Sequence, residues 1–220
     1  IALTHVPAHI EKVAWIDTDL IFEREHWLRD ASALLDSHEV LQLFDTIRHL
    51  PPQTTSYQGV SIRERRSLFS LVDEYGADAF WMMQQGRVPF AVPGGAFAAR
   101  RSVMSAGLYD RHVMGENDNI FAYAVLGALD RVRTATTAFA RSIREWELRF
   151  AASRTDFTSA HLPGTIYHLW HGDLTHRGYL SRSETLRLYD FDPSNDLAIH
   201  ENGCFRWNSP KPGLHDATHI

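Results

Sequence analysis

The sequence has a single cysteine, no long hydrophobic run and no excess of basic residues. With Cys204 alone, no disulfide can form within the chain, which fits a reducing compartment. No apolar run approaches the roughly 18 residues of a membrane-spanning helix, so we expect no membrane span. The net charge of −5 does not favour a nucleic-acid surface, because such a surface requires a basic patch.

The sequence also lacks an initiator methionine and a signal-peptide pattern. It opens at Ile1 and reaches its first acidic motif almost at once. We therefore expect a piece of a longer protein, incomplete at the N-terminus, with a cytoplasmic location as the default. Within this piece we expect a catalytic region over residues 1–192 and a polar, loop-rich tail over residues 193–220.

The composition supports a folded core, since 44% of the residues are hydrophobic and 11% are aromatic. Short apolar runs alternate with stretches of helical spacing, which predicts an α/β fold with an open mixed sheet flanked by helices. The expected strands are 13–16, 40–47, 94–99 and 165–170. The expected helices are 25–37, 61–74, 102–106, 117–129, 139–153 and 182–189.

The first candidate site is Asp17-Thr18-Asp19, which follows the apolar strand 13–16. Residues i and i+2 of an extended chain point the same way, so Asp17 and Asp19 converge at the end of a strand. Close like charges repel, and a divalent cation with a preference for oxygen ligands relieves the repulsion. The alternative is a loop in which one aspartate caps the next helix.

Two further motifs combine glycine and acidic residues. Gly94 and Gly95 enter a short apolar strand, and paired glycines allow the backbone to approach a ligand closely. The alternative is an ordinary turn. Glu116 and Asp118 precede an apolar helix, where one of them is a candidate general base. The alternative is that they cap the helix and interact with its dipole.

The fourth motif is Tyr167-His168-Leu169-Trp170-His171-Gly172, at the end of an expected strand. Imidazole is a common metal ligand and also a proton donor or acceptor near neutral pH. His168 and His171 are therefore candidate metal ligands. The alternative is surface polarity or a hydrogen-bonded buried histidine.

Taken in order, these motifs resemble those of the GT-A glycosyltransferases, closest to bacterial family-2-like and galactosyltransferase-type enzymes. The resemblance runs from Val13 to Tyr189. It implies a nucleotide-binding α/β sheet merged with an acceptor-binding portion, and it implies that upstream nucleotide-binding strands are missing here. The implied activity is transfer of a hexose from a nucleotide-sugar, with a UDP-sugar as the expected donor, to a saccharide or other hydroxyl acceptor. The implied cofactor is Mn²⁺ or Mg²⁺.

The resemblance also implies roles for particular residues. Asp19 would bind the metal, and Asp17 would face the donor's ribose and the metal region. Asp118 would be the catalytic base, with Glu116 as a sugar contact or alternative base. The remaining implied roles are an additional metal ligand (His168 or His171), contacts to donor or acceptor (Gly94 and Gly95) and a contact to the diphosphate (Arg177). Because water would hydrolyse the donor, we also expect Trp170 to form part of the wall of the donor and acceptor site.

Two other functions use the same residue types. A metal-dependent hydrolase could employ Asp17, Asp19, His168 and His171 as its metal site. That function leaves the glycine pair and the acids at 116 and 118 without a role. A catalytically silent sugar-binding module is the third possibility.

Overall fold

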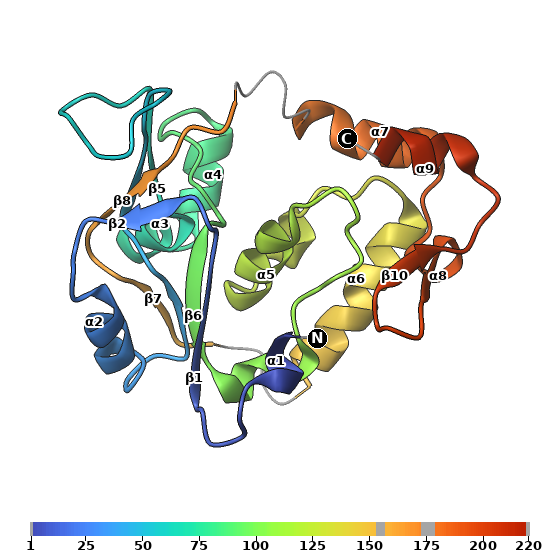
Figure 1. Cartoon of the computed structure of the whole chain (residues 1–220), viewed down its shortest axis with the longest axis horizontal. Coiled ribbons are helices and arrows are strands. Elements are labelled where there is room, and N and C mark those ends of the chain that lie inside the picture. The colour runs from blue at the N-terminus through green and yellow to red at the C-terminus, as the bar shows by residue number, and fades with distance from the viewer. Residues whose placement is uncertain (1, 153–156, 173–178, 219–220) are drawn as a thin grey trace.

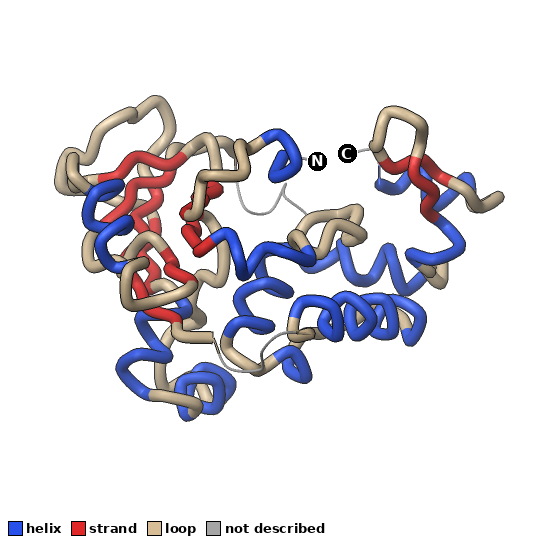
Figure 2. The backbone as a smooth tube through the Cα atoms, turned by 90° about the horizontal axis from the view of Figure 1, so that it is seen from below, coloured by secondary structure: helices blue, strands red, loops and turns tan. Residues whose placement is uncertain are grey.

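The structure is a computed structural model of the 220-residue chain. It describes residues 2–152, 157–172 and 179–218. Most strands gather in one half of the molecule, and most of the longer helices lie in the other half together with one two-stranded sheet (Figures 1 and 2). The fold is therefore mixed α/β with open mixed sheets flanked by helices, as predicted.

The first sheet is four-stranded, with the order β1-β6-β3-β7. Its strands are β1 (Lys12–Ile16), β6 (Ala96–Arg100), β3 (Val40–Gln42) and β7 (Ser159–His161). The pair β3 and β7 is parallel, whereas β6 is antiparallel to both β1 and β3. The expected strands at 13–16 and 94–99 are confirmed, although the glycine pair itself precedes β6.

The second sheet is also four-stranded, with the order β2-β8-β4-β5. Its strands are β2 (Leu20–Phe22), β8 (Thr165–His168), β4 (Thr46–His49) and β5 (Arg63–Arg66). Here β4 and β8 are parallel, and the two outer pairs are antiparallel. The expected strand at 165–170 is confirmed and ends two residues earlier, at His168.

Three stretches of chain pass directly from the first sheet into the second, at residues 17–19, 43–45 and 162–164. The single strand expected at 40–47 is therefore wrong, because the chain crosses between sheets in its middle. Leu43 and Phe44 at this crossing are buried, so the apolar run continues through the break. The crossing at 17–19 carries the two aspartates of the first motif.

Three helices pack in the strand-rich half: α2 (Trp27–Leu34), α3 (Leu68–Tyr75) and α4 (Asp78–Gln84). The helix expected at 25–37 is confirmed over a shorter span. The helix expected at 61–74 is wrong in its first part, where residues 63–66 pair with β4 as strand β5. Ser67 then caps α3 by accepting a hydrogen bond from the Ser70 N–H.

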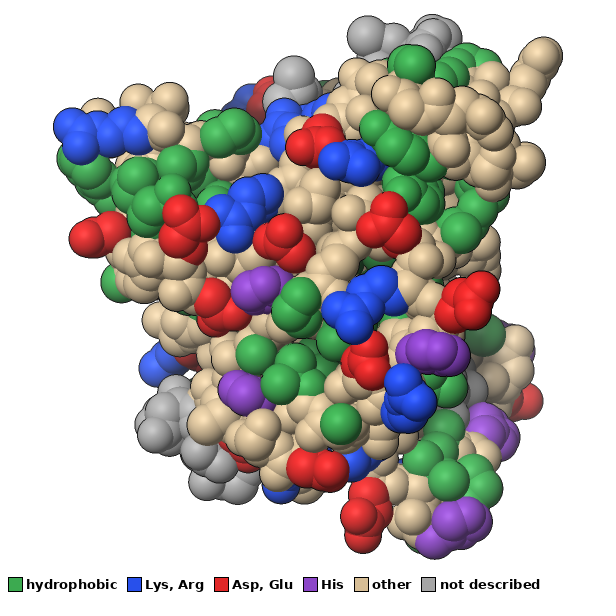
Figure 3. Space-filling view, turned by 90° about the vertical axis from the view of Figure 1, so that its left-hand side faces the viewer, with side chains coloured by type: hydrophobic (Ala, Val, Ile, Leu, Met, Phe, Trp, Pro, Cys, Tyr) green, Lys and Arg blue, Asp and Glu red, His purple; other side chains and the backbone are tan. Residues whose placement is uncertain are grey.

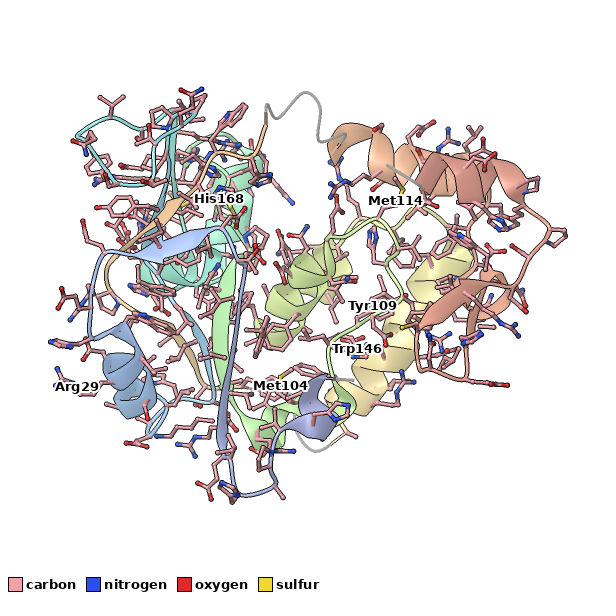
Figure 4. All side chains as sticks on the ribbon, viewed as in Figure 1. Arg29, Met104, Tyr109, Met114, Trp146 and His168 are labelled. Carbon is pink, nitrogen blue, oxygen red and sulfur yellow. The ribbon has the colours of Figure 1, made fainter. Side chains whose placement is uncertain are left out.

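The other half contains η1 (Arg101–Ala106), α5 (Asn117–Val125), η2 (Leu129–Arg131), α6 (Thr137–Phe150) and α7 (Tyr179–Leu188). These elements confirm the helices expected near 102, 117, 139 and 182. Tyr109 and Trp146 lie between them (Figure 4), and the Tyr109 hydroxyl donates a 3.0 Å hydrogen bond to Ser142 Oγ. This packing holds α6 against the segment that leads to α5.

The C-terminal segment is more ordered than the expected loop-rich tail. It forms α8 (Pro193–Asp196), β9 (Leu197–Ile199), β10 (Phe205–Trp207) and α9 (Pro212–Thr218), with β9 and β10 paired antiparallel. Leu214 is fully buried in the larger core. The buried Asp196 carboxylate accepts hydrogen bonds from Lys211 Nζ at 3.0 Å and from the Asp192 N–H at 2.8 Å. The C-terminal segment therefore forms a small packed unit, although its polar composition predicted loops.

At the other end of the described chain, α1 (Ala2–His5) packs through Leu3 against the larger core. Within the described residues, every helix is too short or too polar to cross a bilayer. Figure 3 shows one face of the strand-rich half, on which acidic, basic and histidine side chains are interspersed with hydrophobic ones.

Candidate functional site

The crossing at residues 17–19 is anchored at both ends by backbone hydrogen bonds. The Asp17 N–H donates to the Gly95 carbonyl at 2.8 Å, which extends the β1–β6 pairing by one residue. The Asp19 carbonyl accepts from the Leu169 N–H at 2.8 Å, just beyond β8. The two aspartates are therefore fixed to different strands, Asp17 beside the glycine pair and Asp19 beside the histidine motif.

Asp19 lies within hydrogen-bonding range of both histidines of the fourth motif. Its Oδ2 is 3.1 Å from His171 Nε2 and 3.5 Å from His168 Nε2. The prediction that one of these imidazoles lies within reach of Asp19 is confirmed, and the structure brings both there. His168 is mostly buried and His171 is exposed, so the cluster opens to solvent on the His171 side.

The ring of His168, which Figure 4 labels in the strand-rich half, is oriented by two contacts. Its Nδ1 lies 2.7 Å from the Leu169 carbonyl, to which a protonated Nδ1 donates a hydrogen bond. In the neutral imidazole this partner leaves the lone pair on Nε2, the atom that faces Asp19. The ring also packs against His49, with centroids 4.6 Å apart.

These residues fit a divalent metal ion. One donor atom from each of Asp19, His168 and His171 lies within 4.8 Å of the others. Carboxylate and imidazole are ligands that manganese and zinc both accept, and the His168 contact to a backbone carbonyl is typical of a metal-ligating histidine. Asp17, predicted as a further metal ligand, is outside this cluster.

The glycine pair lies directly against Asp118. The Gly95 N–H donates to Asp118 Oδ2 at 3.3 Å, and Gly95 has a positive φ of 98°. A Cβ at Gly94 would lie 2.3 Å from the same oxygen, so a larger residue at 94 would displace the carboxylate. The buried Gln42 amide donates to the carbonyls of Val92 at 2.9 Å and Gly94 at 3.2 Å. The absence of a side chain at Gly94 therefore leaves space for the Asp118 carboxylate. The hydrogen bonds from Gln42 hold the backbone of this segment in place.

Neither predicted acid caps helix α5 through its side chain. Glu116 occupies the N-cap position in a left-handed conformation, with φ of 69°, and its side chain makes no capping hydrogen bond. Asp118 bonds to Gly95 instead of to its own helix. The capping alternative therefore does not explain this pair, although Asp118 in the first turn still interacts favourably with the helix dipole.

Burial changes the acidity of all three acids around the glycine pair. Burial, with smaller contributions from the negative charges of Asp118 and Asp19, raises the pKa of Asp17 to about 6. Burial also raises the pKa of Asp118, against the effect of the Gly95 N–H. The pKa of Glu116 is raised by burial, and the nearby Arg182 opposes that shift. A carboxylate with a raised pKa is a stronger base, which suits general-base catalysis.

The acids line a cavity of about 390 Å³. Six of the predicted site residues contribute to its wall: Asp17, Gly94, Gly95, Glu116, Asp118 and His168. Because His168 belongs to both the cavity wall and the Asp19 cluster, the two features adjoin. The exposed Trp170 is not part of the wall. Arg177 lies outside the described residues.

The cavity also contains residues that the sequence analysis missed. His49, Arg63, Arg65 and Arg182 all line it. His49 is distant in sequence from any histidine motif, and the arginines fell in regions expected to be helical. Residues 63–66 are all charged, so no apolar alternation marks them as a strand, and the helical spacing that follows them extends the expected helix over them.

The buried His112, whose Nε2 lies 3.8 Å from Glu116 Oε2, gives a testable dependence of stability on pH. Burial, with a smaller contribution from the positive charge of Arg182, lowers its pKa from 6.5 to about 4. Between pH 6.5 and pH 4 the unfolded chain binds a proton at His112, whereas the folded chain does not. The contribution of His112 to the free energy of unfolding is therefore fully present above pH 6.5 and is lost as the pH falls toward 4. We expect this group to cost about 2 kcal/mol of unfolding free energy between pH 7 and pH 5.

The measurement is urea unfolding of the wild type and of His112→Gln at both pH values. The difference between the two proteins should shrink or reverse at pH 5, because glutamine does not titrate. The matched control is His9→Gln at an exposed position, which should keep the wild-type pH dependence. An equal pH dependence in all three proteins would show that His112 takes up its proton readily in the folded state.

No family model, curated protein or solved structure matches this chain. Any assignment of function therefore rests on the site itself, an Asp–His–His cluster adjoining a cavity walled by three acids of raised pKa and a glycine pair.

Proposed function

We propose that this chain transfers a sugar from a nucleotide-sugar, with a UDP-sugar as the expected donor, to an acceptor hydroxyl with inversion at the anomeric carbon. The main support for the proposal is that two separate features of the site adjoin at His168. One is the Asp19–His168–His171 cluster, and the other is the cavity into which Asp118 is placed by the glycine pair. A hydrolase needs the first feature but gives the second no role.

Asp19, His168 and His171 would hold the cation at the edge of the cavity. A bound Mn²⁺ or Mg²⁺ would supply positive charge that offsets the charge developing on the departing diphosphate. The hydrogen bond from His168 to the Leu169 carbonyl keeps its Nε2 directed at Asp19, so the ring needs no reorientation.

Asp118 is the proposed general base. The acceptor oxygen attacks the anomeric carbon, the bond from that carbon to the diphosphate oxygen breaks, and the acceptor proton passes to the Asp118 carboxylate. A single displacement of this kind inverts the anomeric centre. The Gly95 N–H fixes one carboxylate oxygen at 3.3 Å, which leaves the other for the acceptor hydroxyl.

Asp17 and Glu116 complete the wall around the reacting groups. Asp17 is tied through its backbone to Gly95 and would contact the donor between the metal cluster and Asp118. Glu116 is half-buried, and the positive charge of Arg182 lowers the pKa of its carboxyl group, against the effect of burial. It would contact the sugar, and it is the alternative general base if Asp118 is not the base.

The proposal is tested by incubating the chain with a panel of nucleotide-sugars and Mn²⁺, alongside a phosphoester substrate. We expect release of nucleoside diphosphate from one donor, loss of that release with EDTA, and recovery when Mn²⁺ is restored. Cleavage of the phosphoester with no donor turnover would instead identify a metal-dependent hydrolase. Donor binding without turnover would identify a silent sugar-binding module.

A further inference from the structure

Three neighbouring strands of the second sheet place a row of side chains on the cavity wall. His168 of β8 is in register with His49 of β4, and His49 is in register with Arg63 of β5. Residues in register on neighbouring strands point to the same face, and the 4.6 Å between the two imidazole centroids agrees with that. Since strands lie about 4.8 Å apart, the backbone of Arg63 is roughly 10 Å from that of His168.

The alternation of strand β5 sorts its charges onto two faces. Arg63 and Arg65 line the cavity, because residues i and i+2 of a strand share a face. Glu64 and Arg66 point the other way and are neutralised there. Arg48 Nε lies 2.6 Å from Glu64 Oε2, and Arg66 pairs with Asp45 and Glu74. The cavity-facing pair is thus the part of β5 for which the described residues provide no ion pair.

Neither Arg63 nor Arg65 forms an ion pair with a carboxylate of the described residues. One Arg65 nitrogen donates to the Phe90 carbonyl at 2.5 Å, which orients the guanidinium without neutralising it. Burial lowers the pKa of Arg65, and the like charge of Arg63 lowers it further. Two half-buried cations side by side repel each other, and a bound anion would relieve that repulsion.

We propose that Arg63 and Arg65 form a subsite for an acidic group, a carboxylate or a phosphate, on the acceptor sugar. The planar fork of donors on arginine suits both groups. This inference rests on the proposed function, which places the donor's diphosphate at the Asp19 cluster. The arginines occupy the opposite end of the row from that cluster, so the anion they bind belongs to the second substrate.

The test is a saturation-transfer NMR titration of the full chain with glucose, galactose and mannose, each as the neutral sugar, the uronate and the 6-phosphate. In at least one series we expect a charged form to bind about tenfold tighter than its neutral parent. Arg63→Gln and Arg65→Gln should each remove that preference, and Arg63→Lys should restore part of it. Preference for the uronate identifies a carboxylate and preference for the 6-phosphate identifies a phosphate.

The matched control is Arg29→Gln, on the exposed side of α2 and far from His168 (Figure 4). It should keep the wild-type preference. The subsite is overturned if the wild type binds neutral and charged sugars equally, or if Arg63→Gln and Arg65→Gln both keep the preference. It is also overturned if Arg63→Gln weakens binding of UDP with Mn²⁺ as strongly as binding of the acidic sugar. Charge-selective sugar binding without any transfer would support the subsite and reject the glycosyltransferase function.

Discussion

Asp118→Asn should lower kcat by about 10²-fold or more while leaving thermal stability almost unchanged. The loss is the usual scale for removing a general base, because an amide does not accept a proton at neutral pH. Asparagine has the size of aspartate, and its side-chain oxygen can still accept the Gly95 N–H hydrogen bond. The measurement is turnover of the nucleotide-sugar identified in the donor panel, together with thermal unfolding.

The matched control for Asp118→Asn is Asp78→Asn, an exposed aspartate in the first turn of α4. It makes the same chemical change at a helix start and should leave turnover intact. If Asp118→Asn is active and Glu116→Gln is inactive, the base is Glu116. If both remain active, the inverting mechanism loses its base.

The pH dependence of kcat tests the role of Asp118 independently. Burial raises the pKa of Asp118, so its basic form should be lost at a higher pH than for an ordinary aspartate. We expect kcat to fall on the acid side of the profile, and that limb should be absent from the residual activity of Asp118→Asn.

Asp19→Ala should abolish Mn²⁺-dependent turnover and weaken Mn²⁺ binding itself. Its carboxylate lies within 3.5 Å of both imidazoles, so its removal takes away one of the three donor groups. The loss of affinity should exceed the roughly 10- to 100-fold that outer-shell partners of a metal contribute. Titration of Mn²⁺ by electron paramagnetic resonance measures binding without relying on activity.

A second carboxylate–imidazole pair provides the matched control for Asp19→Ala. Asp73 Oδ2 lies 2.6 Å from His161 Nδ1, but among the residues that the structure describes no third candidate ligand joins this pair. Asp73→Ala should leave Mn²⁺ affinity unchanged. Unchanged Mn²⁺ affinity in Asp19→Ala would show that the Asp19–His168–His171 cluster is not the metal site. Comparing His168→Ala with His171→Ala then shows which imidazole contributes more.

Local pattern was sufficient to predict much of the site. A short apolar run ending in Asp17-Thr18-Asp19 predicts a strand whatever surrounds it, and β1 and β2 flank that motif. The histidine motif likewise falls at the end of β8. The sequence pattern could not predict which residues the carboxylates of Asp17 and Asp19 contact. Asp17 and Asp19 share a face in an ideal strand, but the chain crosses between sheets there, which separates their environments.

The sequence by itself determined the α/β class, the apolar strands and the presence of acids and histidines at element ends, because these depend on residue spacing within one segment. The tertiary structure decided the rest. Pairing with β4 made a strand of residues 63–66 and turned Arg63 and Arg65 toward the cavity. Burial of Leu214 ordered a segment whose polar composition indicated loops. These outcomes depend on contacts between residues far apart in sequence, and such contacts override weak local preferences in short segments.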